Sequence, residues 1–519
     1  MKQKRNGGRR LLALLLAVCL LGGLTANVFA FDNVIASGTC GAEGDGSNLS
    51  WKFTADGTLT ITGAGAMKDF DMYGAPWRGH LVSYSVPKTL VLDDRITHIG
   101  EYAFGDNNSL GFSGALHLPE SLVSIGCNAF QNCSELTGTL TLPSGLTTIG
   151  DMAFYSCSSF TGDLVIPETC VNIGEYAFDQ TGFTGSLTLP STMTSIADSA
   201  FGGSCFTGAL RLPASVQQIG NYAFHSCHFT GALTIPEGCT SIGNGAFNGT
   251  AFSGSLSLPS TLRSIGEYAF SDCTGFTGSL TLPDGLETLG ENAFSRCTGF
   301  TGTLQVPGSL KEIGVYAFSD ATFTKLILND GLETIRASAY SDCTSLTGTV
   351  RIPNSVTTIG GSAFQGTENL TGVTLSRKLT TLGESAFYMS GISGTLTIPE
   401  GVAEIGDYTF YDCKNLTSVK LPKTLVSIGE YAFHGCTGLH GNLRLPDKLT
   451  TIGYGAFYEC SGLTGLTPGS ELSSIGKFAF QGCTGLQGKI VFGEKITTID
   501  GHAFYDCDGV SAFCFLGDA

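Results

Sequence analysis

The sequence predicts a repeat solenoid: a right-handed coil of the α/β type, in which short parallel β-strands alternate with 3₁₀ or helical turns. The first observation is internal repetition, because the hexapeptide IGEYAF at Ile99–Phe104 recurs in related form along most of the chain. The second is composition: Gly accounts for 72 of 519 residues, about twice its usual share, and charged residues for only 14%. This composition is typical of a turn-rich, strand-based repeat.

The aromatic residue that ends each copy gives the period. The copies end at Phe104, Phe130, Phe154, Phe178, Phe201, Phe224, Phe247, Phe270, Phe294, Phe318, Tyr340, Phe364, Phe387, Phe410, Phe433, Phe457, Phe480 and Phe504. These 18 copies cover 400 residues in 17 steps, a mean period of about 23.5. We therefore expect about 18 coils stacked in one direction, spanning on the order of 85 Å at the usual strand spacing.

One unit, residues 280–300, shows how each coil is expected to form. Leu280 and Leu282 flank a Thr and predict a short strand with one face inward, which Pro283 ends. Leu286 and Leu289 are the next inward pair, and a turn follows at Gly290. Residues 291–294 are too few for a regular helix and predict one helical or 3₁₀ turn. Five large apolar side chains cannot offset the backbone entropy of 23 residues, so a unit needs neighbours to fold.

The repeat pattern resembles the BspA-like branch of the leucine-rich-repeat family. The matching run is L-x-L/I-P-x-x-L/V-x-x-I-G-x-x-A-F-x-x-C-x-x-L, which is almost intact at Val419–Leu439 and covers about residues 90–510. The resemblance implies an extracellular, non-catalytic protein used for adhesion or recognition, usually on bacterial cell surfaces. It does not imply a particular ligand. No wall-sorting motif follows the last copy, so the mode of anchoring stays open.

The segment before the repeats divides into a leader and a small module. Five basic residues, an apolar run at Leu11–Leu21 and small residues up to Ala30 predict a signal peptide at residues 1–30. Residues 31–89 also resemble the leader module of BspA-like proteins. Trp51 and Phe53, and then Leu59 and Ile61, alternate around a turn at Asp56-Gly57, which predicts a β-hairpin that caps the first coil. The repeats would then occupy residues 90–510 and a short end residues 511–519.

Charge limits the classes of partner. The chain carries a net charge of −17, and removal of the signal peptide leaves 22 basic and 44 acidic residues. Such a surface disfavours nucleic acid and anionic membranes. After signal cleavage no segment is long and apolar enough to span a membrane. We expect a monomer, located outside the cell or on its surface, with no cofactor.

The cysteines argue against a disulfide framework despite their number, 18. Eleven follow the repeat aromatic by three residues: Cys133, Cys157, Cys227, Cys273, Cys297, Cys343, Cys413, Cys436, Cys460, Cys483 and Cys507. Other copies place Asn, Thr, Ser or Ala there, so the position selects for small size and a weak hydrogen bond. We predict buried free thiols. Cys40, Cys127, Cys205 and Cys514 are off-register and stay open to pairing.

No catalytic motif is present. The sequence lacks H-E-x-x-H, G-x-S-x-G and a complete P-loop, so we expect no enzymatic activity. His225, Cys227 and His228 have a zinc-like spacing, but Cys227 belongs to the inward ladder, so we expect no metal site. Acidic residues such as Glu101 and Glu175 recur after the turn glycine, where a carboxylate favours the positive end of the turn. A calcium ladder is the alternative.

The outward residues of the first strand form the expected functional face. Most are Thr, which suits a solvated sheet, but four are cations on an acidic protein: Arg211, Arg351, Lys420 and Arg444. We interpret these four as the candidate ligand-binding residues, able to meet an acidic patch or a polyanionic glycan. A second row, Tyr102, Tyr176, Tyr222, Tyr268, Tyr316, Tyr408 and Tyr431, is interpreted as packing between coils.

Two functions remain open from the sequence. The first is binding of an extracellular protein or glycan of unknown identity through the strand face. The second is a structural role, as a rigid spacer or surface-layer component without a specific ligand. Ice binding along the Thr row is a weaker third hypothesis, because Arg, Gln, Ile and Val interrupt the row.

Overall fold

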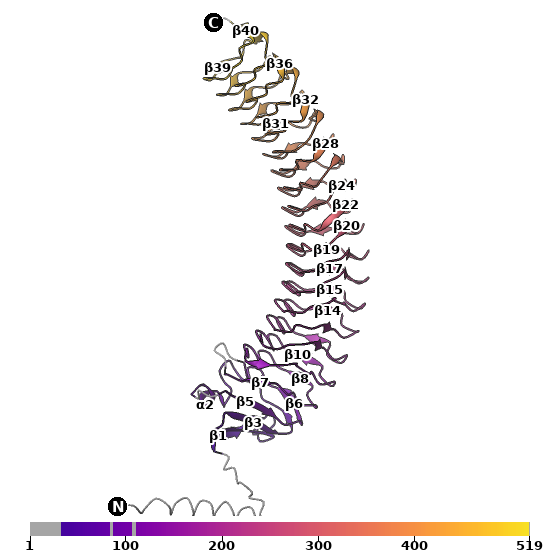
Figure 1. Cartoon of the computed structure of the whole chain (residues 1–519), viewed down its shortest axis with the longest axis vertical. Coiled ribbons are helices and arrows are strands. Elements are labelled where there is room, and N and C mark those ends of the chain that lie inside the picture. Colours follow the sequence, from indigo (N-terminus) through magenta and orange to yellow (C-terminus); the bar gives the residue numbers. More distant parts are fainter. Residues whose placement is uncertain (1–32, 84–86, 106–109, 518–519) are drawn as a thin grey trace, which may run out of the picture.

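The chain forms a long, bent rod of stacked coils (Figure 1). The computed structural model describes residues 33–83, 87–105 and 110–517, so the predicted signal peptide lies outside the described residues. Within the described part almost no helix is present. Most coils contribute two short strands, and where strands of successive coils pair they run parallel, as the repeat predicts.

The N-terminal elements precede the regular coils. They are β1 (Val34–Thr39), β2 (Leu49–Thr54), β3 (Thr58–Gly63), β4 (Gly65–Ala66), α2 (Arg78–Val82) and β5 (Thr89–Leu92). The first strands of the coils are β7 (Gly114–Ala115), β9 (Leu136–Thr137), β11 (Leu164–Val165), β13 (Leu187–Thr188), β16 (Leu233–Thr234), β18 (Leu256–Ser257), β20 (Gly278–Thr281), β22 (Phe300–Val306), β24 (Lys325–Leu328), β26 (Gly348–Arg351), β28 (Leu370–Thr374), β30 (Gly394–Thr397), β32 (Leu416–Lys420), β34 (Gly441–Arg444), β36 (Leu463–Thr467), β38 (Gly488–Phe492) and β40 (Val510–Phe515).

The second strands are shorter and end at the repeat Ile or Leu before the turn. They are β6 (Ile96–Ile99), β8 (Ser124–Ile125), β10 (Thr148–Ile149), β12 (Asn172–Ile173), β14 (Ser195–Ile196), β15 (Gln218–Ile219), β17 (Ser241–Ile242), β19 (Ser264–Ile265), β21 (Thr288–Leu289), β23 (Glu312–Ile313), β25 (Thr334–Ile335), β27 (Thr358–Ile359), β29 (Thr381–Leu382), β31 (Glu404–Ile405), β33 (Ser427–Ile428), β35 (Thr451–Ile452), β37 (Ser474–Ile475) and β39 (Thr498–Ile499). One such strand accompanies each of the expected coils.

A single stack of aromatic rings runs through the interior. It begins with Trp77 on Phe104 and continues through every repeat aromatic to Phe504, with ring centroids 5.0 to 5.8 Å apart. Tyr340 replaces Phe in this stack and is buried. A second stack, from Phe160 to Phe323, meets the first edge to face. Offset and edge-on ring contacts of this kind add to the burial of apolar area.

The expected helical turns are wrong in detail, because the segments after the second strands are turns with left-handed residues. Tyr102 has φ 51° and Asn132 has φ 60°, and equivalent residues in most described coils share this conformation. A left-handed residue breaks a right-handed helix. It also points backbone N–H groups along the rod: Tyr102 N donates to the Cys127 carbonyl at 3.0 Å, and Phe104 N to the Ala129 carbonyl at 2.8 Å. The turns are therefore bonded from coil to coil.

The side chains that follow the turn glycine form a second set of hydrogen bonds between coils. The residues that accept these bonds are Asp and Asn rather than Glu. Asp151 Oδ1 accepts the N–H of Glu175 at 2.9 Å, and Asp407 Oδ1 accepts that of Glu430. Asn221 Oδ1 accepts the N–H of Asn244 at 2.8 Å. The shorter side chains reach the next backbone, whereas Glu101 and its equivalents occupy the same row without such a bond among the described contacts.

The cysteine ladder is buried and makes hydrogen bonds, as expected. In all eleven coils the thiol lies 3.0 to 3.4 Å from the carbonyl oxygen of the repeat aromatic one coil earlier. Ser204 donates to Phe178 in the same way at 2.8 Å. All cysteines of the described residues are free, including Cys40, Cys127, Cys205 and Cys514.

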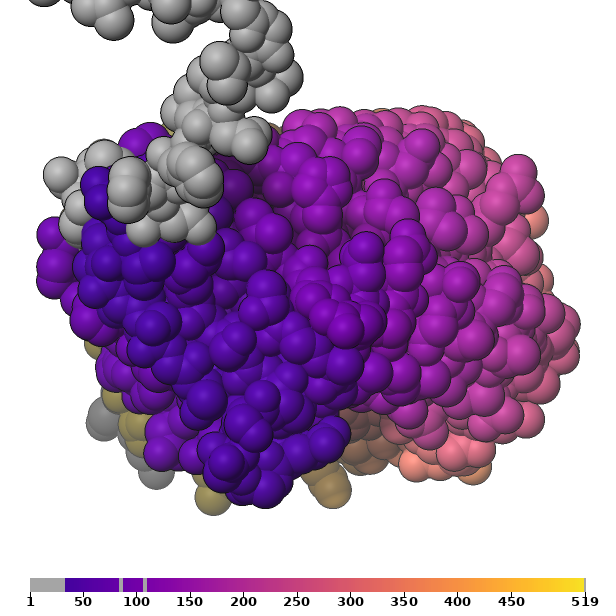
Figure 2. All heavy atoms as spheres, turned by 90° about the horizontal axis from the view of Figure 1, so that it is seen from below, coloured from indigo at the N-terminus to yellow at the C-terminus, as the bar shows by residue number. Residues whose placement is uncertain are grey.

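The N-terminal module contacts the first coils. β2 pairs with β3 in antiparallel register, placing Trp51 opposite Ile61, and β3 pairs in parallel with β5. The Trp77 indole N–H donates to the Ala103 carbonyl at 2.9 Å. Seen from below, the atoms of this module, in indigo, stand in front of the first coils (Figure 2). Its role as a cap stays a prediction.

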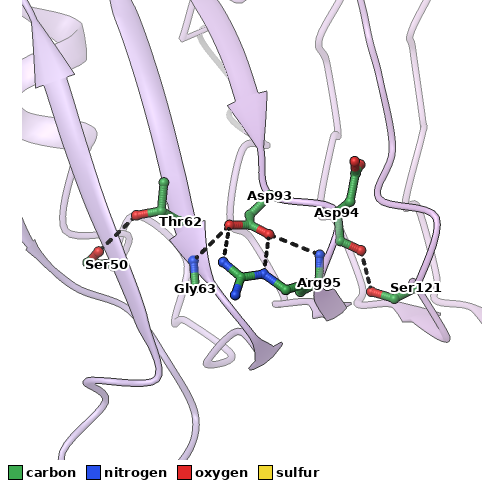
Figure 3. Close-up of polar contacts among 7 residues, drawn as sticks. All are labelled: Ser50, Thr62, Gly63, Asp93, Asp94, Arg95 and Ser121. Carbon is green, nitrogen blue, oxygen red and sulfur yellow. Dashed lines mark hydrogen bonds and ion pairs between the residues drawn. The ribbon is translucent and has the colours of Figure 1, made fainter.

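Asp93, just after β5, joins the module to the coils. Its Oδ2 accepts the Gly63 N–H at 3.3 Å, and both its oxygens accept bonds from the Arg95 guanidinium (Figure 3). The hydrogen bonds from Arg95 hold the pKa of this carboxyl well below its usual value. On the next residue, the Asp94 carbonyl accepts the Ser121 hydroxyl at 2.6 Å. The junction thus links β3, the β5–β6 turn and the following coil.

Candidate functional site: the strand face

The first strands present one face to solvent. In β26, Val350 points inward and is buried, whereas Arg351 is exposed. The parallel register aligns Arg351 with Thr374, Thr397 with Lys420, and Arg444 with Thr467. Residues one period apart therefore stand side by side along the rod, and cations from different coils share one surface.

The structure places two of the four predicted cations on adjacent coils. Lys420 lies in β32 and Arg444 in β34, which follow one another along the rod but belong to separate two-stranded sheets. Arg351 lies three coils before Lys420. Arg211 lies six coils before Arg351, in a segment without regular strand structure, and stands apart from the others.

All four cations are exposed. Within residues 33–83, 87–105 and 110–517, none of them makes a hydrogen bond or ion pair through its side chain. Several cations elsewhere on the rod are paired: Lys311 Nζ lies 2.9 Å from Glu333 Oε1, and Arg336 contacts Glu312. The strand-face charges therefore remain available for a ligand.

Sequence reasoning missed a second row of cations, which follows the strand-ending proline position. Arg377 and Lys423 occupy it, aligned with Asn354 and Glu400 one coil earlier. The Arg377 N–H donates to Asn354 Oδ1 at 3.0 Å, and the Lys423 N–H to Glu400 Oε2 at 2.9 Å. These bonds hold the turns in register. The cations of this row can be read in the sequence, but their alignment becomes visible only when residues 23 apart are placed side by side.

The same turns carry two more exposed cations, Lys378 and Lys448. Between the two rows lies a hollow of about 500 Å³. Its polar lining is Arg377, Glu400 and three threonines, and its apolar lining is Val373, Leu375, Ile398 and Pro399. The hollow is open to solvent and lies midway between Arg351 and Lys420 along the rod.

A different side of the C-terminal coils carries aromatic rings. Tyr388, Tyr411, His434 and Tyr458 directly follow the repeat Phe and stack with centroids 4.3 to 4.9 Å apart. Beside them Tyr408 stacks on Tyr431 at 5.2 Å. The ring faces are covered by one another, so these residues extend the packing between coils.

The zinc-like cluster does not come together. Cys227 is buried and donates to the Phe201 carbonyl at 3.1 Å, and burial raises the pKa of its thiol. His225 Nε2 instead faces the buried Asp179, 3.6 Å from its Oδ1. In the part of the chain that the structure describes, no three His, Cys, Asp or Glu side chains meet as a metal-binding group.

Comparison with known proteins agrees with this architecture. The family model for the BspA type leucine rich repeat region matches residues 83–207, 160–277, 204–297, 276–393 and 393–511. No curated protein matches the chain.

Solved structures of leucine-rich-repeat proteins are among those that match this chain. A leucine-rich repeat protein from Bacteroides ovatus is 24% identical, with 87% of this chain and 98% of that chain covered and a TM-score of 0.49. A leucine rich cell surface protein from Faecalibacterium prausnitzii is 22% identical over 91% and 94%, with a TM-score of 0.29. The leucine-rich repeat protein of T. pallidum is 30% identical over 31% and 77%, also with a TM-score of 0.29.

The family match spans the whole stack of coils, from the module junction to β40. This chain belongs to the family of BspA-type leucine-rich-repeat proteins.

Proposed function

We propose that this protein is a non-catalytic binding protein, secreted or held at the cell surface, that recognises an extracellular protein or glycan through its strand face. The observation that carries the proposal is the set of exposed cations Arg351, Lys420 and Arg444, which have no acidic partner among the described residues of an otherwise acidic chain. Unpaired like charges on one face repel one another, and an anionic ligand would relieve that repulsion. Arg211 belongs to the same face but acts, on this proposal, at a distance from the other three.

The location outside the cell rests on the predicted signal peptide and on the family. Among residues 33–83, 87–105 and 110–517, no helix has the length and apolar character needed to cross a membrane. A free-thiol ladder is compatible with an oxidising compartment because the thiols are buried and separated from oxidants.

The test is capture of extracellular-matrix proteins and glycans by the purified chain. Changing Arg351, Lys420 and Arg444 to Glu should abolish capture while the unfolding transition stays unchanged. The matched control changes Lys68, Arg263 and Lys477 to Glu; these are exposed cations off the strand face, so net charge changes equally. Capture that survives the first triple change, or is lost equally in both, would remove the strand face from consideration.

The unbroken ring stack favours one alternative, a rigid spacer or surface-layer component without a specific ligand. A spacer would show no saturable binding to any extracellular component, and both triple variants would then behave like the parent chain in every capture assay.

A further inference from the structure

The strand-face cations belong to a larger basic strip, which we define as the exposed charges of the first strands and following turns of five consecutive coils, β26 to β34. The strand row contributes Arg351, Lys420 and Arg444, and the turn rows contribute Arg377, Lys378, Lys423 and Lys448. Only Glu400 and Asp447 carry negative charge in the same rows. In the coils on either side of the strip, the corresponding turns carry acidic residues: Asp330 lies before the strip and Glu471 after it.

The strip is long and narrow. Five coils at about 4.8 Å extend about 19 Å between the first and last backbone. The strand row and the turn row are three residues apart in the chain, as Arg351 and Asn354 are, so the strip is about 10 Å wide. Positive charge is therefore spread along a line parallel to the rod axis rather than gathered at a point.

Small polar groups lie between these charges. Thr374, Thr397 and Ser418 stand beside the cations on the strand face, and Thr395 and Thr397 line the hollow next to Arg377. No Phe, Tyr or Trp occurs in these strands and turns. Apolar residues also line the hollow, but Leu375 and Ile398 are buried and Val373 and Pro399 half-buried. Apart from Glu400 and Asp447, the exposed side chains are therefore mainly hydroxyl groups and cations.

We propose that the basic strip binds a linear sulfated polysaccharide. This inference rests on the proposed function and names its ligand class. Sulfate groups spaced along an extended chain match cations spaced along the rod, and the sugar hydroxyls meet threonine hydroxyls in the hollow. A protein partner would favour exposed aromatic or large apolar anchors, and single-stranded nucleic acid would need rings for its bases; the described strands and turns of the strip expose neither.

The probe is heparin, titrated into the purified chain at several salt concentrations. We expect saturable binding whose affinity falls steeply with salt, because each neutralised charge releases counterions. Changing Arg377 and Lys378 together to Glu should weaken binding by about tenfold or more, since the change replaces two neighbouring cations of the strip with two negative charges. The matched control, Lys68 and Lys477 changed to Glu, should leave heparin affinity unchanged. Thermal unfolding of each variant shows that the fold is kept.

Three further probes separate sulfated sugar from other anions. Neutral dextran, polyglutamate and phosphatidylserine vesicles should bind at least about tenfold more weakly than heparin at equal salt. Equal binding of polyglutamate or vesicles overturns the assignment to a sulfated polysaccharide, as does heparin affinity that is unaffected by the Arg377 and Lys378 changes. If matrix capture depends on Arg351, Lys420 and Arg444 but heparin does not bind, the assignment to a sulfated polysaccharide is wrong and the proposed function stands. If the chain neither captures matrix components nor binds heparin, both proposals are wrong.

Discussion

The thiol of Cys297 lies 3.1 Å from the carbonyl oxygen of Phe270, one coil earlier, and Cys273 makes the same contact with Phe247 at 3.0 Å. The carbonyl belongs to a residue whose ring is in the central stack. The thiol therefore adds a second hydrogen bond to a carbonyl that already accepts a backbone N–H within its own coil, as Phe270 does from Cys273 at 3.2 Å. Size and hydrogen bonding together explain why Cys, Ser and Thr share this position.

These thiols should resist alkylation in the folded protein. Burial raises the pKa of Cys273, Cys343 and Cys413 to about 12, and only the thiolate reacts. Iodoacetamide at pH 8 should first modify the partly exposed Cys205 and Cys514. Mass spectrometry of peptides from the native protein would check this. Rapid labelling of Cys273 without unfolding would contradict it.

The same thiols should make stability depend on alkaline pH. An unfolded thiol ionises near pH 8.5, whereas Cys273 does so at about 12. A raised pKa contributes stability that is complete below about pH 8.5 and is lost as pH rises towards 12. The urea midpoint should therefore fall between pH 8 and 10.5. Cys273→Ser should reduce this fall, and Cys514→Ser should not.

Replacing Tyr340 with Phe should stabilise the protein. Tyr340 is 1% exposed, and its hydroxyl has no hydrogen-bond partner among the described residues. An unsatisfied buried polar group costs about 1–3 kcal/mol, so its removal should raise the free energy of unfolding by about 1 kcal/mol or more. The reverse change, Phe364→Tyr, should lower it by a similar amount. Chemical denaturation would measure both changes. A Tyr340→Phe variant that is less stable than the parent chain would contradict the interpretation that the Tyr340 hydroxyl is unsatisfied.

Truncating Trp77 should loosen one end of the rod. Its ring stacks on Phe104 at 5.5 Å, and it is fully buried. Loss of a buried aromatic side chain costs about 3–5 kcal/mol locally. In hydrogen exchange, Trp77→Ala should lose protection at residues 96–105 and 110–130, while residues 420–480 keep theirs. Trp77→Phe keeps a ring and should lose much less. Uniform loss along the rod would contradict nearest-neighbour stability.

Mild acid should weaken the C-terminal coils through His434. Burial between Tyr411 and Tyr458 lowers the pKa of this imidazole, despite the charges of Glu459 and Asp412, and its Nδ1 has no described partner. A lowered His pKa gives stability that is full above about pH 6.5 and declines as pH falls below it. His434→Tyr should remove that part of the decline between pH 7 and 5. An unchanged slope in urea titrations would exclude His434 as the cause.

The sequence predicts the period, the two strands of each coil and the inward ladder because these depend on residue spacing alone. It does not predict the left-handed residues. Tyr102 and Asn132 adopt positive φ because the next coil offers carbonyl acceptors, which a single unit lacks. Hydrogen bonding between coils replaces the helical turn that was expected from the short length of this segment.

The candidate site is predicted only in part, for the same reason. The strand row was recognisable because Arg351, Lys420 and Arg444 occupy one defined repeat position. Arg377, Lys423 and Lys448 become neighbours of that row only when the turn geometry is known. Conversely, Arg211 shares the repeat position but lies too far along the rod to act with the others.

The ring stack from Trp77 to Phe504 has a consequence for how such a protein can change in length. Each ring touches the ring before and the ring after it, and no contact skips a coil. A duplication of one whole 23- or 24-residue segment would insert a new ring between two existing ones and leave every other contact intact. Small differences in length are absorbed within a coil, because the steps between rings already range from 22 to 26 residues without interrupting the stack. Genetic variation should therefore add or remove complete coils and move the basic strip nearer to or farther from the N-terminal module.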